Sequence, residues 1–206
     1  SQISYEPTDI KTFGVQDEIY VSAIIQMEVS PLQTSQLLTD PQFILKADTV
    51  FLQTLISGRK SLYYHKNAGS RENFYIQQGN NFELLAYKKF LIEQVEVITE
   101  NNKYKGQLNF YLNDCQSIST KLANVSYQQR SLIRLFQHYY ECSETAADFQ
   151  KEFEKTKEEV RILAGTSLTS LTFSSSDFDY LVDGGYKSSI NFSTGLFFDF
   201  ILARKQ

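Results

Sequence analysis

The sequence lacks the local patterns that mark most enzymes, cofactor-binding proteins and metal-binding proteins. It contains no G-x-G-x-x-G motif, no Walker loop and no G-x-S-x-G motif. Its two cysteines, Cys115 and Cys142, do not form a C-x-x-C pair, so neither a zinc motif nor a redox motif is present. The only histidines, His65 and His138, have no neighbours that suggest catalysis. We therefore expect no enzymatic activity, no cofactor and no metal.

Net charge, the length of apolar runs and the first residues of the chain disfavour further classes of protein. The net charge of −4 does not favour nucleic-acid binding, which requires a basic surface. No apolar run is long enough for a transmembrane helix, although membrane-spanning β-strands leave a much weaker alternating pattern. The chain opens Ser1-Gln2-Ile3, with neither an initiator Met nor the charged start of a signal peptide. We expect a mature protein or a piece of a longer one.

Residues 1–100 have the composition and spacing of a β-rich domain. The whole chain is 14% aromatic, with 13 Tyr and 16 Phe, and these residues favour strands. Gly58 marks the turn of a hairpin over 49–65, and Gly79 marks a later turn. The segments 48–57 and 82–95 do not alternate strictly, so a helix is the alternative for each. The predicted meander has strands at 3–5, 19–28, 50–56, 61–65, 73–76 and 82–92, with a loop at 30–47 that includes a short helical turn.

Residues 101–160 form a helical segment that ends in a charged linker. Ser126 and Gln129 have the spacing of a capping box at the start of the second helix. The charge-rich stretch 144–160 is a solvated helix or a linker, and we place a boundary there. The apolar faces predict one helix through Leu108, Tyr111, Leu112 and Cys115 and another through Leu132, Leu135, Phe136, Tyr139 and Cys142.

The two cysteines permit one disulfide without requiring it, and two buried thiols are the alternative. Each cysteine lies at the far end of a helical apolar face. Antiparallel packing of the helices would place Cys115 and Cys142 at opposite ends of the pair. A bridge therefore needs a parallel or crossed arrangement, and the segment 116–125 is long enough to return the chain. The spacing does not decide between these alternatives.

Residues 161–206 change character, because Lys and Glu nearly vanish and a long alternation begins at Ser189. From Ile190 to Leu202 one face is apolar almost throughout, whereas the other is small or polar at first. Apolar residues outside and polar residues inside are typical of a transmembrane β-strand. A soluble edge hairpin with one buried face is the alternative.

For the other candidate sites we favour a structural explanation over a functional one. Asp177, Asp179 and Asp183 have a spacing that can bind calcium, but the twelve-residue loop and its closing Glu are missing, so an exposed loop is expected. The sequons at Asn124 and Asn191 are short enough to arise by chance. The aromatic pairs Tyr63-Tyr64, Phe74-Tyr75 and Tyr139-Tyr140 could form a sugar-binding surface, but their spacing favours the core.

One group of segments consists of Phe51–Tyr64, Lys105–Cys115, Leu132–Cys142 and Ile190–Arg204. Together these segments resemble a family of exported Bacteroidota proteins in which a β-rich region and a short helical part precede an outer-membrane β-barrel. The resemblance implies that the N-terminal part is periplasmic, and an oxidising compartment favours a disulfide between Cys115 and Cys142. It also raises a conflict, because a barrel needs at least eight strands and about two follow Val160. Either the chain is a fragment, or the last hairpin packs on the β domain.

The sequence thus predicts an α+β protein with three parts. They are a β-rich domain at 1–100, a two-to-three-helix segment with a charged linker at 101–160, and a C-terminal β-hairpin at 161–206. The expected function is a non-enzymatic structural, assembly or transport role in the periplasm and outer membrane, with envelope proteins as partners and no nucleic acid. The alternative is a soluble envelope module that binds a glycan or a protein. A hydrolase that uses the acidic loop is a third hypothesis, for which the sequence supplies no base or nucleophile.

Overall fold

The computed structural model describes residues 4–152, 157–174 and 185–201 as an α+β protein. Contacts within the chain group it into two units, 1–152 and 153–206, so the helices belong to the same unit as the main sheet. The strands are β1 Thr12–Val15, β2 Glu18–Glu28, β3 Leu45–Ser57, β4 Leu62–Lys66, β5 Glu72–Gln78, β6 Asn81–Leu84, β7 Lys88–Ile92, β8 Val97–Asn101, β9 Phe149–Gln150, β10 Lys157–Thr169 and β11 Ser189–Ile201. The helices are η1 Thr34–Gln36, α1 Lys103–Tyr111, α2 Ile118–Leu122 and α3 Gln129–Cys142.

The main sheet is the predicted antiparallel meander, with strands in the order β1-β2-β3-β4-β5-β6. Segment 48–57 is strand, which excludes the helical alternative there. The loop between β2 and β3 contains the expected short helical turn, η1. The predicted strand at 3–5 is not formed at Tyr5, and Ile3 lies outside the described residues.

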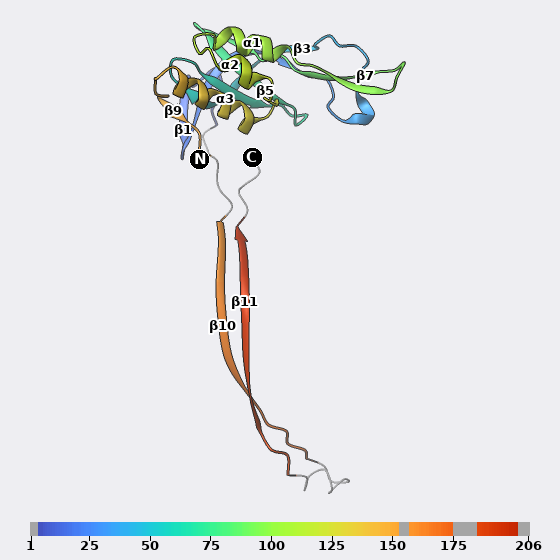
Figure 1. The fold of residues 1–206 in the computed structure, drawn as a ribbon, viewed down its shortest axis with the longest axis vertical. Coiled ribbons are helices and arrows are strands. Elements are labelled where there is room, and N and C mark those ends of the chain that lie inside the picture. Colours follow the sequence, from blue (N-terminus) through green and yellow to red (C-terminus); the bar gives the residue numbers. More distant parts are fainter. Residues whose placement is uncertain (1–3, 153–156, 175–184, 202–206) are drawn as a thin grey trace. The chain divides into compact units, whose positions relative to one another are not determined.

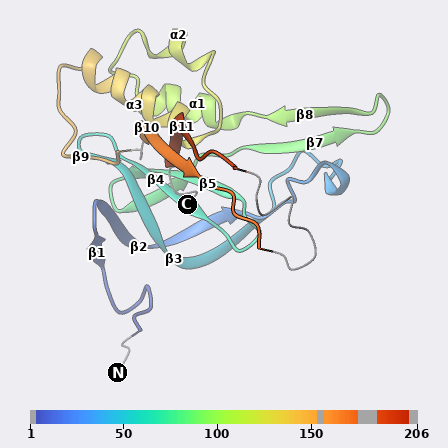
Figure 2. The same ribbon diagram turned by 90° about the horizontal axis from the view of Figure 1, so that it is seen from below.

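The predicted single strand over 82–92 is wrong, because the chain breaks between β6 and β7. Residues of helix α1 form hydrogen bonds with the backbone at this break. The Ala86 N–H donates to Gln107 Oε1 at 2.8 Å, and the Ala86 carbonyl accepts the Tyr104 N–H at 2.9 Å. Strand β7 consequently leaves the main sheet and pairs with β8 in a separate hairpin (Figures 1 and 2).

Both faces of the main sheet carry buried side chains, since successive residues of a strand point to opposite sides. Tyr63 and Tyr75 are directly paired and face a core cluster with Ile25 and Leu52. Their neighbours face the helical layer that Figure 1 shows on one side of the sheet. The fully buried residues on that side include Leu62, Phe74 and Ile76 from the sheet and Leu108, Leu132, Phe136 and Tyr139 from the helical segment.

Two tyrosines of the helical layer hold the β3–β4 turn. The Tyr140 hydroxyl accepts the Lys60 N–H at 3.1 Å and donates to the Lys60 carbonyl at 2.6 Å. The Tyr111 hydroxyl accepts the Ser61 N–H at 3.0 Å and donates to the Gln77 carbonyl at 3.0 Å. The turn is therefore satisfied by side chains from α1 and α3, in addition to its own strand pairing.

The helices end where the predicted disulfide can form, and Cys115 is bonded to Cys142 with a Cα–Cα distance of 5.8 Å. The segment 116–125, which contains α2, returns the chain between α1 and α3. The C-terminal ends of α1 and α3 therefore lie together. Closing a loop of 27 residues removes unfolded-state entropy that corresponds to about 3.5 kcal/mol of stability in the loop-entropy account.

One local prediction in the helical segment is wrong, and one of the two alternatives for the stretch 144–160 is excluded. Ser126 does not cap α3, because its N–H donates to Ser131 Oγ at 3.0 Å and the helix begins after Gln128 without a side-chain cap. The stretch 144–160 contains no helix in its described residues. It contributes β9, which pairs with β3 at Ile56 and Ser57. The predicted apolar face of α3 is confirmed.

The chain leaves the first unit beside a buried ion pair. Lys151 Nζ lies 2.8 Å from Glu18 Oε1, and the lysine side chain is only 5% exposed. The Lys151 N–H also donates to the Leu55 carbonyl at 2.8 Å. A lysine is tolerated at such depth because its charge is paired, and the pairing fixes the last residues of the first unit on the sheet.

The second unit contains a long hairpin in which β10 pairs with β11 over thirteen residue pairs, from Lys157↔Ile201 to Thr169↔Ser189. This agrees with the predicted C-terminal hairpin, although β10 begins four residues before the expected boundary at 161. No helix among the described residues is long and apolar enough to cross a membrane. The three-part division by composition stays a prediction.

The β3–β4 turn predicts opposite effects of alanine at two glycines. Gly58 has a φ of +147°, and an added Cβ would lie 2.6 Å from the Tyr140 hydroxyl and 3.3 Å from the Asp148 nitrogen. We expect Gly58→Ala to lower the free energy of unfolding by about 2 kcal/mol or more. Gly106→Ala is the control, since it adds a methyl to helix α1 in open space and should raise stability by about 0.5–1 kcal/mol. Urea unfolding measures both, and equal effects would contradict the strain at Gly58.

Candidate functional site

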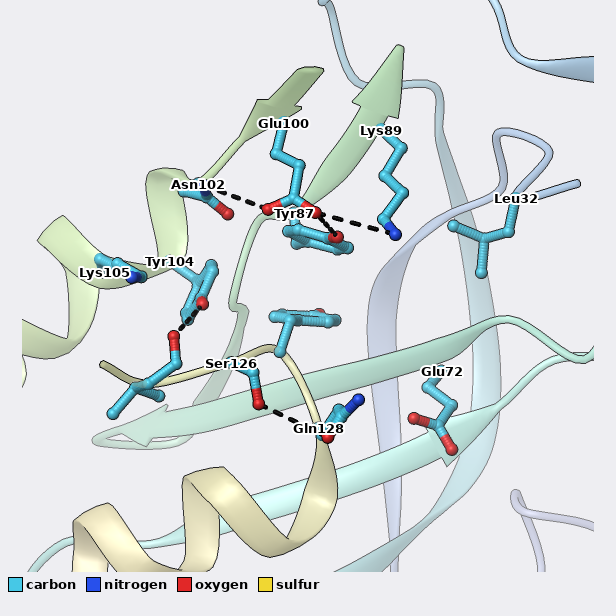
Figure 3. A pocket seen from close by; sticks show the side chains of 12 residues that line it. Leu32, Glu72, Tyr87, Lys89, Glu100, Asn102, Tyr104, Lys105, Ser126 and Gln128 are labelled. Atoms are coloured by element: carbon cyan, nitrogen blue, oxygen red, sulfur yellow. Dashed lines mark hydrogen bonds and ion pairs between the residues drawn. The ribbon is translucent and has the colours of Figure 1, made fainter. Parts of the chain in front are cut away.

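A cleft lies between the loop that follows β2 and the segments that precede β7 and α3. It consists of three adjoining cavities of about 480, 440 and 240 Å³, and Leu32 lines all of them. The loop 29–36 and the turn 66–71 contribute one side. Tyr87 and Tyr127, from different parts of the chain, contribute the other. Figure 3 shows Tyr87 in the largest of the three cavities. A concave site with a few convergent polar groups is the usual form of a small-molecule site.

Tyrosine packing makes one wall of the cleft rigid. Tyr87 and Tyr127 stack with ring centroids 4.6 Å apart and an angle of 19° between the rings. Tyr104 packs edge-on against both, at 6.0 and 5.1 Å. The Tyr127 hydroxyl accepts the Phe74 N–H and donates to the Leu85 carbonyl at 2.7 Å, which ties the ring to the sheet. Such contacts fix the rings in place.

Glu100 organises the upper rim of the cleft. Its Oε1 accepts the Tyr87 hydroxyl at 2.8 Å and lies 3.7 Å from Lys89 Nζ (Figure 3). Its Oε2 accepts a weaker hydrogen bond from Asn102 Nδ2 at 3.4 Å. Burial, and secondarily the hydrogen bond to Glu100, raise the pKa of Tyr87 above its ordinary value. Tyr87 therefore remains a neutral donor over the physiological pH range.

Arg71 lies beneath the cleft and lines the two smaller cavities. It is only 4% exposed. Its Nη1 donates to the Ser30 carbonyl at 2.8 Å and its Nη2 to the Tyr87 carbonyl at 2.6 Å. The guanidinium thus joins the two walls. A guanidinium has five N–H groups, so three of those on Arg71 have no acceptor among the residues that the structure describes.

Arg71 also belongs to a chain of buried polar residues. The Glu28 N–H donates to Asn73 Oδ1 at 3.2 Å, and the Ser30 N–H donates to Glu28 Oε1 at 2.8 Å. Four buried atoms of these linked polar residues have no hydrogen-bond partner within the described part of the protein: Glu28 Oε2, Ser30 Oγ, Arg71 Nε and Asn73 Nδ2. Buried groups of this kind are usually satisfied by ordered water or by a ligand.

The charge on Arg71 is not matched by a contacting carboxylate. In the described part of the chain no carboxylate oxygen lies within ion-pair distance of it. Desolvation lowers the pKa of Arg71, whereas the charge on Glu28 acts in the opposite direction. The ordinary pKa of arginine is so high that the group stays protonated, and the cleft therefore has a buried cation at its base.

The sites predicted from the sequence lie elsewhere. The aromatic pairs Tyr63-Tyr64, Phe74-Tyr75 and Tyr139-Tyr140 are buried, which confirms that they belong to the core. Asp177, Asp179 and Asp183 lie outside the described residues. Across 4–152, 157–174 and 185–201, no group of three or more His, Cys, Asp or Glu side chains is placed to hold a metal ion.

Neither histidine lines the three cavities. His138 Nε2 lies 2.8 Å from Ser117 Oγ, which also approaches both disulfide sulfurs, at 3.3 and 3.6 Å. His65 is half-buried on β4, and desolvation lowers its pKa. Arg71, Tyr87 and Tyr127 were not predicted as site residues, and no local pattern in the sequence marks them.

The second candidate surface is one face of the β10–β11 hairpin. Residues that are directly paired across the two strands share a face, so Ile162 and Leu196 lie together, as do Val160 and Phe198. Phe192 is 82% exposed and Ile162 78% exposed. The large exposed apolar residues on this face are Val160, Ile162, Leu168, Ile190, Phe192, Leu196, Phe198 and Phe200.

The opposite face of the hairpin is mostly small or polar. Its pairs include Ser193 with Gly165 and Ser167 with Asn191. Arg161 Nη2 lies 2.7 Å from Glu159 Oε2 and 3.3 Å from Asp199 Oδ2. Leu163 and Phe197 are exposed large apolar residues on this side.

Comparison of the chain with protein-family models, with curated proteins and with solved structures found no match.

The cleft predicts that Arg71 stabilises the fold as well as the site. Arg71→Met removes both charge-assisted hydrogen bonds and leaves the Ser30 and Tyr87 carbonyls without that donor. We expect a loss of about 3 kcal/mol in the free energy of unfolding, measured in urea. Lys66→Met, at the exposed rim of the same cleft, is the matched control and should change stability by less than about 0.5 kcal/mol. A loss below about 1 kcal/mol for Arg71→Met would contradict the bridging role.

Proposed function

We propose that the chain is a non-enzymatic part of a bacterial outer-membrane protein with a structural, assembly or transport role. In this proposal the β10–β11 hairpin forms two neighbouring strands of a membrane β-barrel, and residues 1–152 form a periplasmic unit. The proposal rests on one observation, the contiguous exposed apolar face of the hairpin. Large exposed apolar surfaces are rare on soluble monomers and usually mark an interface with a membrane or a partner.

The length of the hairpin supports a membrane location. Each strand has thirteen residues, and a membrane-spanning strand tilted by roughly 45° needs about 9–11 residues. At about 3.3 Å per residue the strands extend over about 40 Å, which exceeds the roughly 30 Å thickness of the hydrocarbon layer. The strands are therefore long enough to cross a bilayer at the tilt that barrel strands adopt.

The two faces of the hairpin have the chemistry that a barrel wall requires. Phe192, Leu196 and Phe198 would contact lipid, whereas Ser193, Gly165 and Asn191 would face a polar interior. The ion-paired Arg161 lies on the same side as these polar residues. A lone two-stranded hairpin is marginal in water, so this one depends on surroundings that cover its apolar face.

A complete barrel would need strands from outside residues 1–206. Barrels of this class have at least eight strands, and the hairpin supplies two. A continuation of the chain or other chains would provide the others. The Cys115–Cys142 disulfide fits a periplasmic location, because such bonds persist in oxidising compartments.

A second role, the binding of a glycan or a protein partner by residues 1–152, is favoured by the cleft at Leu32, Arg71, Tyr87 and Tyr127. The two roles are compatible because they use different units of the chain. The core location of the predicted aromatic pairs argues against a binding surface at those positions. The binding role therefore rests on the cleft.

Single tryptophans test which face of the hairpin contacts an apolar phase. The chain has no Trp, so Phe192→Trp and Ser193→Trp each introduce one reporter on neighbouring residues of opposite faces. With the chain 1–206 bound to lipid vesicles, we expect a blue-shifted emission and quenching by brominated lipid for Phe192→Trp. Ser193→Trp is the control and should remain quenched by aqueous iodide.

Equal aqueous exposure of both tryptophans in the presence of vesicles would refute the membrane role. Blue-shifted emission from Phe192→Trp in a monomeric chain without vesicles would also count against it, because residues of the same chain would then cover the face.

A further inference from the structure

We propose that the cleft formed by the loop 29–36, the turn 66–71, Tyr87 and Tyr127 binds a saccharide that carries a carboxylate. This inference rests on the binding role proposed for residues 1–152 and names the chemistry of its ligand. The carboxylate approaches Arg71 from the cavities that Arg71 lines, and the sugar ring lies near Leu32 and the tyrosine wall.

The first observation is the unfilled hydrogen-bonding capacity of Arg71. Three of its N–H groups lack an acceptor in the described residues, and Nε is fully buried. A buried guanidinium without a paired anion is costly, and a carboxylate matches its donors in a two-point contact. Glu28 is a buried carboxylate whose charge acts on Arg71, but the two residues form no ion pair. The fixed hydrogen bonds to Ser30 and Tyr87 hold the guanidinium in place before a ligand arrives.

The second observation is the balance of charge around the three cavities. Four cationic side chains line them: Lys66, Arg71, Lys89 and Lys105. Two carboxylates do so, those of Glu72 and Glu100. The lining is therefore positive by two charges in a chain whose net charge is −4. The cleft thus has the opposite sign to the molecule as a whole, which favours an acidic ligand at this place.

The third observation is the type of neutral group that accompanies these charges. Amides and hydroxyls from Gln33, Gln36, Asn67, Asn102, Ser126 and Gln128 line the cavities. Each amide can donate and accept, which suits the many hydroxyls of a sugar. The apolar part of the lining consists of three tyrosines and of Val29, Pro31, Leu32 and Val125, and the tyrosine rings are its largest groups. The lining favours a saccharide over a peptide.

The test measures binding of three probes to the chain 1–206 in a mild detergent by titration calorimetry. The probes are trigalacturonic acid, the uncharged trisaccharide galactotriose and the peptide tri-alanine. We expect saturable binding of trigalacturonic acid, at least about tenfold tighter than that of galactotriose, and no binding of tri-alanine. Binding of the acidic sugar should weaken as salt rises.

Two variants locate the site without disturbing the buried network. Leu32 is 40% exposed at the junction of the cavities, so Leu32→Glu adds a repelling charge where folding tolerates it. Ile24→Glu makes the same change at a position that is 79% exposed on β2 and does not line the cleft. We expect Leu32→Glu to weaken trigalacturonic acid binding about tenfold and Ile24→Glu to leave it unchanged, with equal urea midpoints for both folded variants.

The outcomes separate this inference from the role beneath it. Equal affinity for the two trisaccharides would overturn the acidic specificity while leaving a sugar-binding cleft. Absence of binding by either sugar, or preference for tri-alanine, would overturn the saccharide inference. Equal weakening by both glutamate variants would place the binding outside the cleft.

Discussion

The fold of residues 1–152 depends on the contact between the sheet and its helical layer. Strands β4 and β5 are too short to bury their apolar side chains unless the helices cover one face, and Phe74, Phe136 and Tyr139 become fully buried there. The hydroxyls of Tyr111 and Tyr140 add hydrogen bonds to the β3–β4 turn, where Gly58 leaves room for them. The disulfide then fixes the ends of α1 and α3 beside that turn. The same layer places Tyr127 against the sheet, so the cleft depends on this packing.

The β10–β11 hairpin, in contrast, leaves one apolar face exposed. Its strands satisfy each other's backbone groups along one edge, but its apolar face has no cover among the described residues. Phe192 and Leu196 are directly comparable with the buried Phe74 and Leu62 in size and type, yet they stay exposed. Burial of apolar surface is the main favourable term in folding, so such a face has to meet lipid or protein. The proposed membrane role would meet that requirement with lipid.

Features set by local periodicity could be predicted from the sequence, whereas features set by long-range contact could not. The turn at Gly58, the apolar face of α3 and the alternation after Ser189 each lie within one element. The break at Ala86 depends on Gln107, and the pairing of Lys151 depends on Glu18, which is 133 residues away. The cleft is similar, since Arg71, Tyr87 and Tyr127 meet only after the sheet and helices have packed. The two cysteines permit a disulfide, and the segment 116–125 is long enough to return the chain, but its spacing does not place α2 there.

We propose that the β10–β11 hairpin needs lipid or another protein to cover its apolar face. The most direct measurement compares residues 1–152 alone with the chain 1–206, in solubility and in urea unfolding, with and without detergent. The account predicts that 1–152 stays monomeric without detergent and unfolds in one cooperative step, whereas 1–206 aggregates unless detergent is present. If 1–152 fails to fold while 1–206 is soluble and monomeric in water, the hairpin belongs to a common core and the account is wrong.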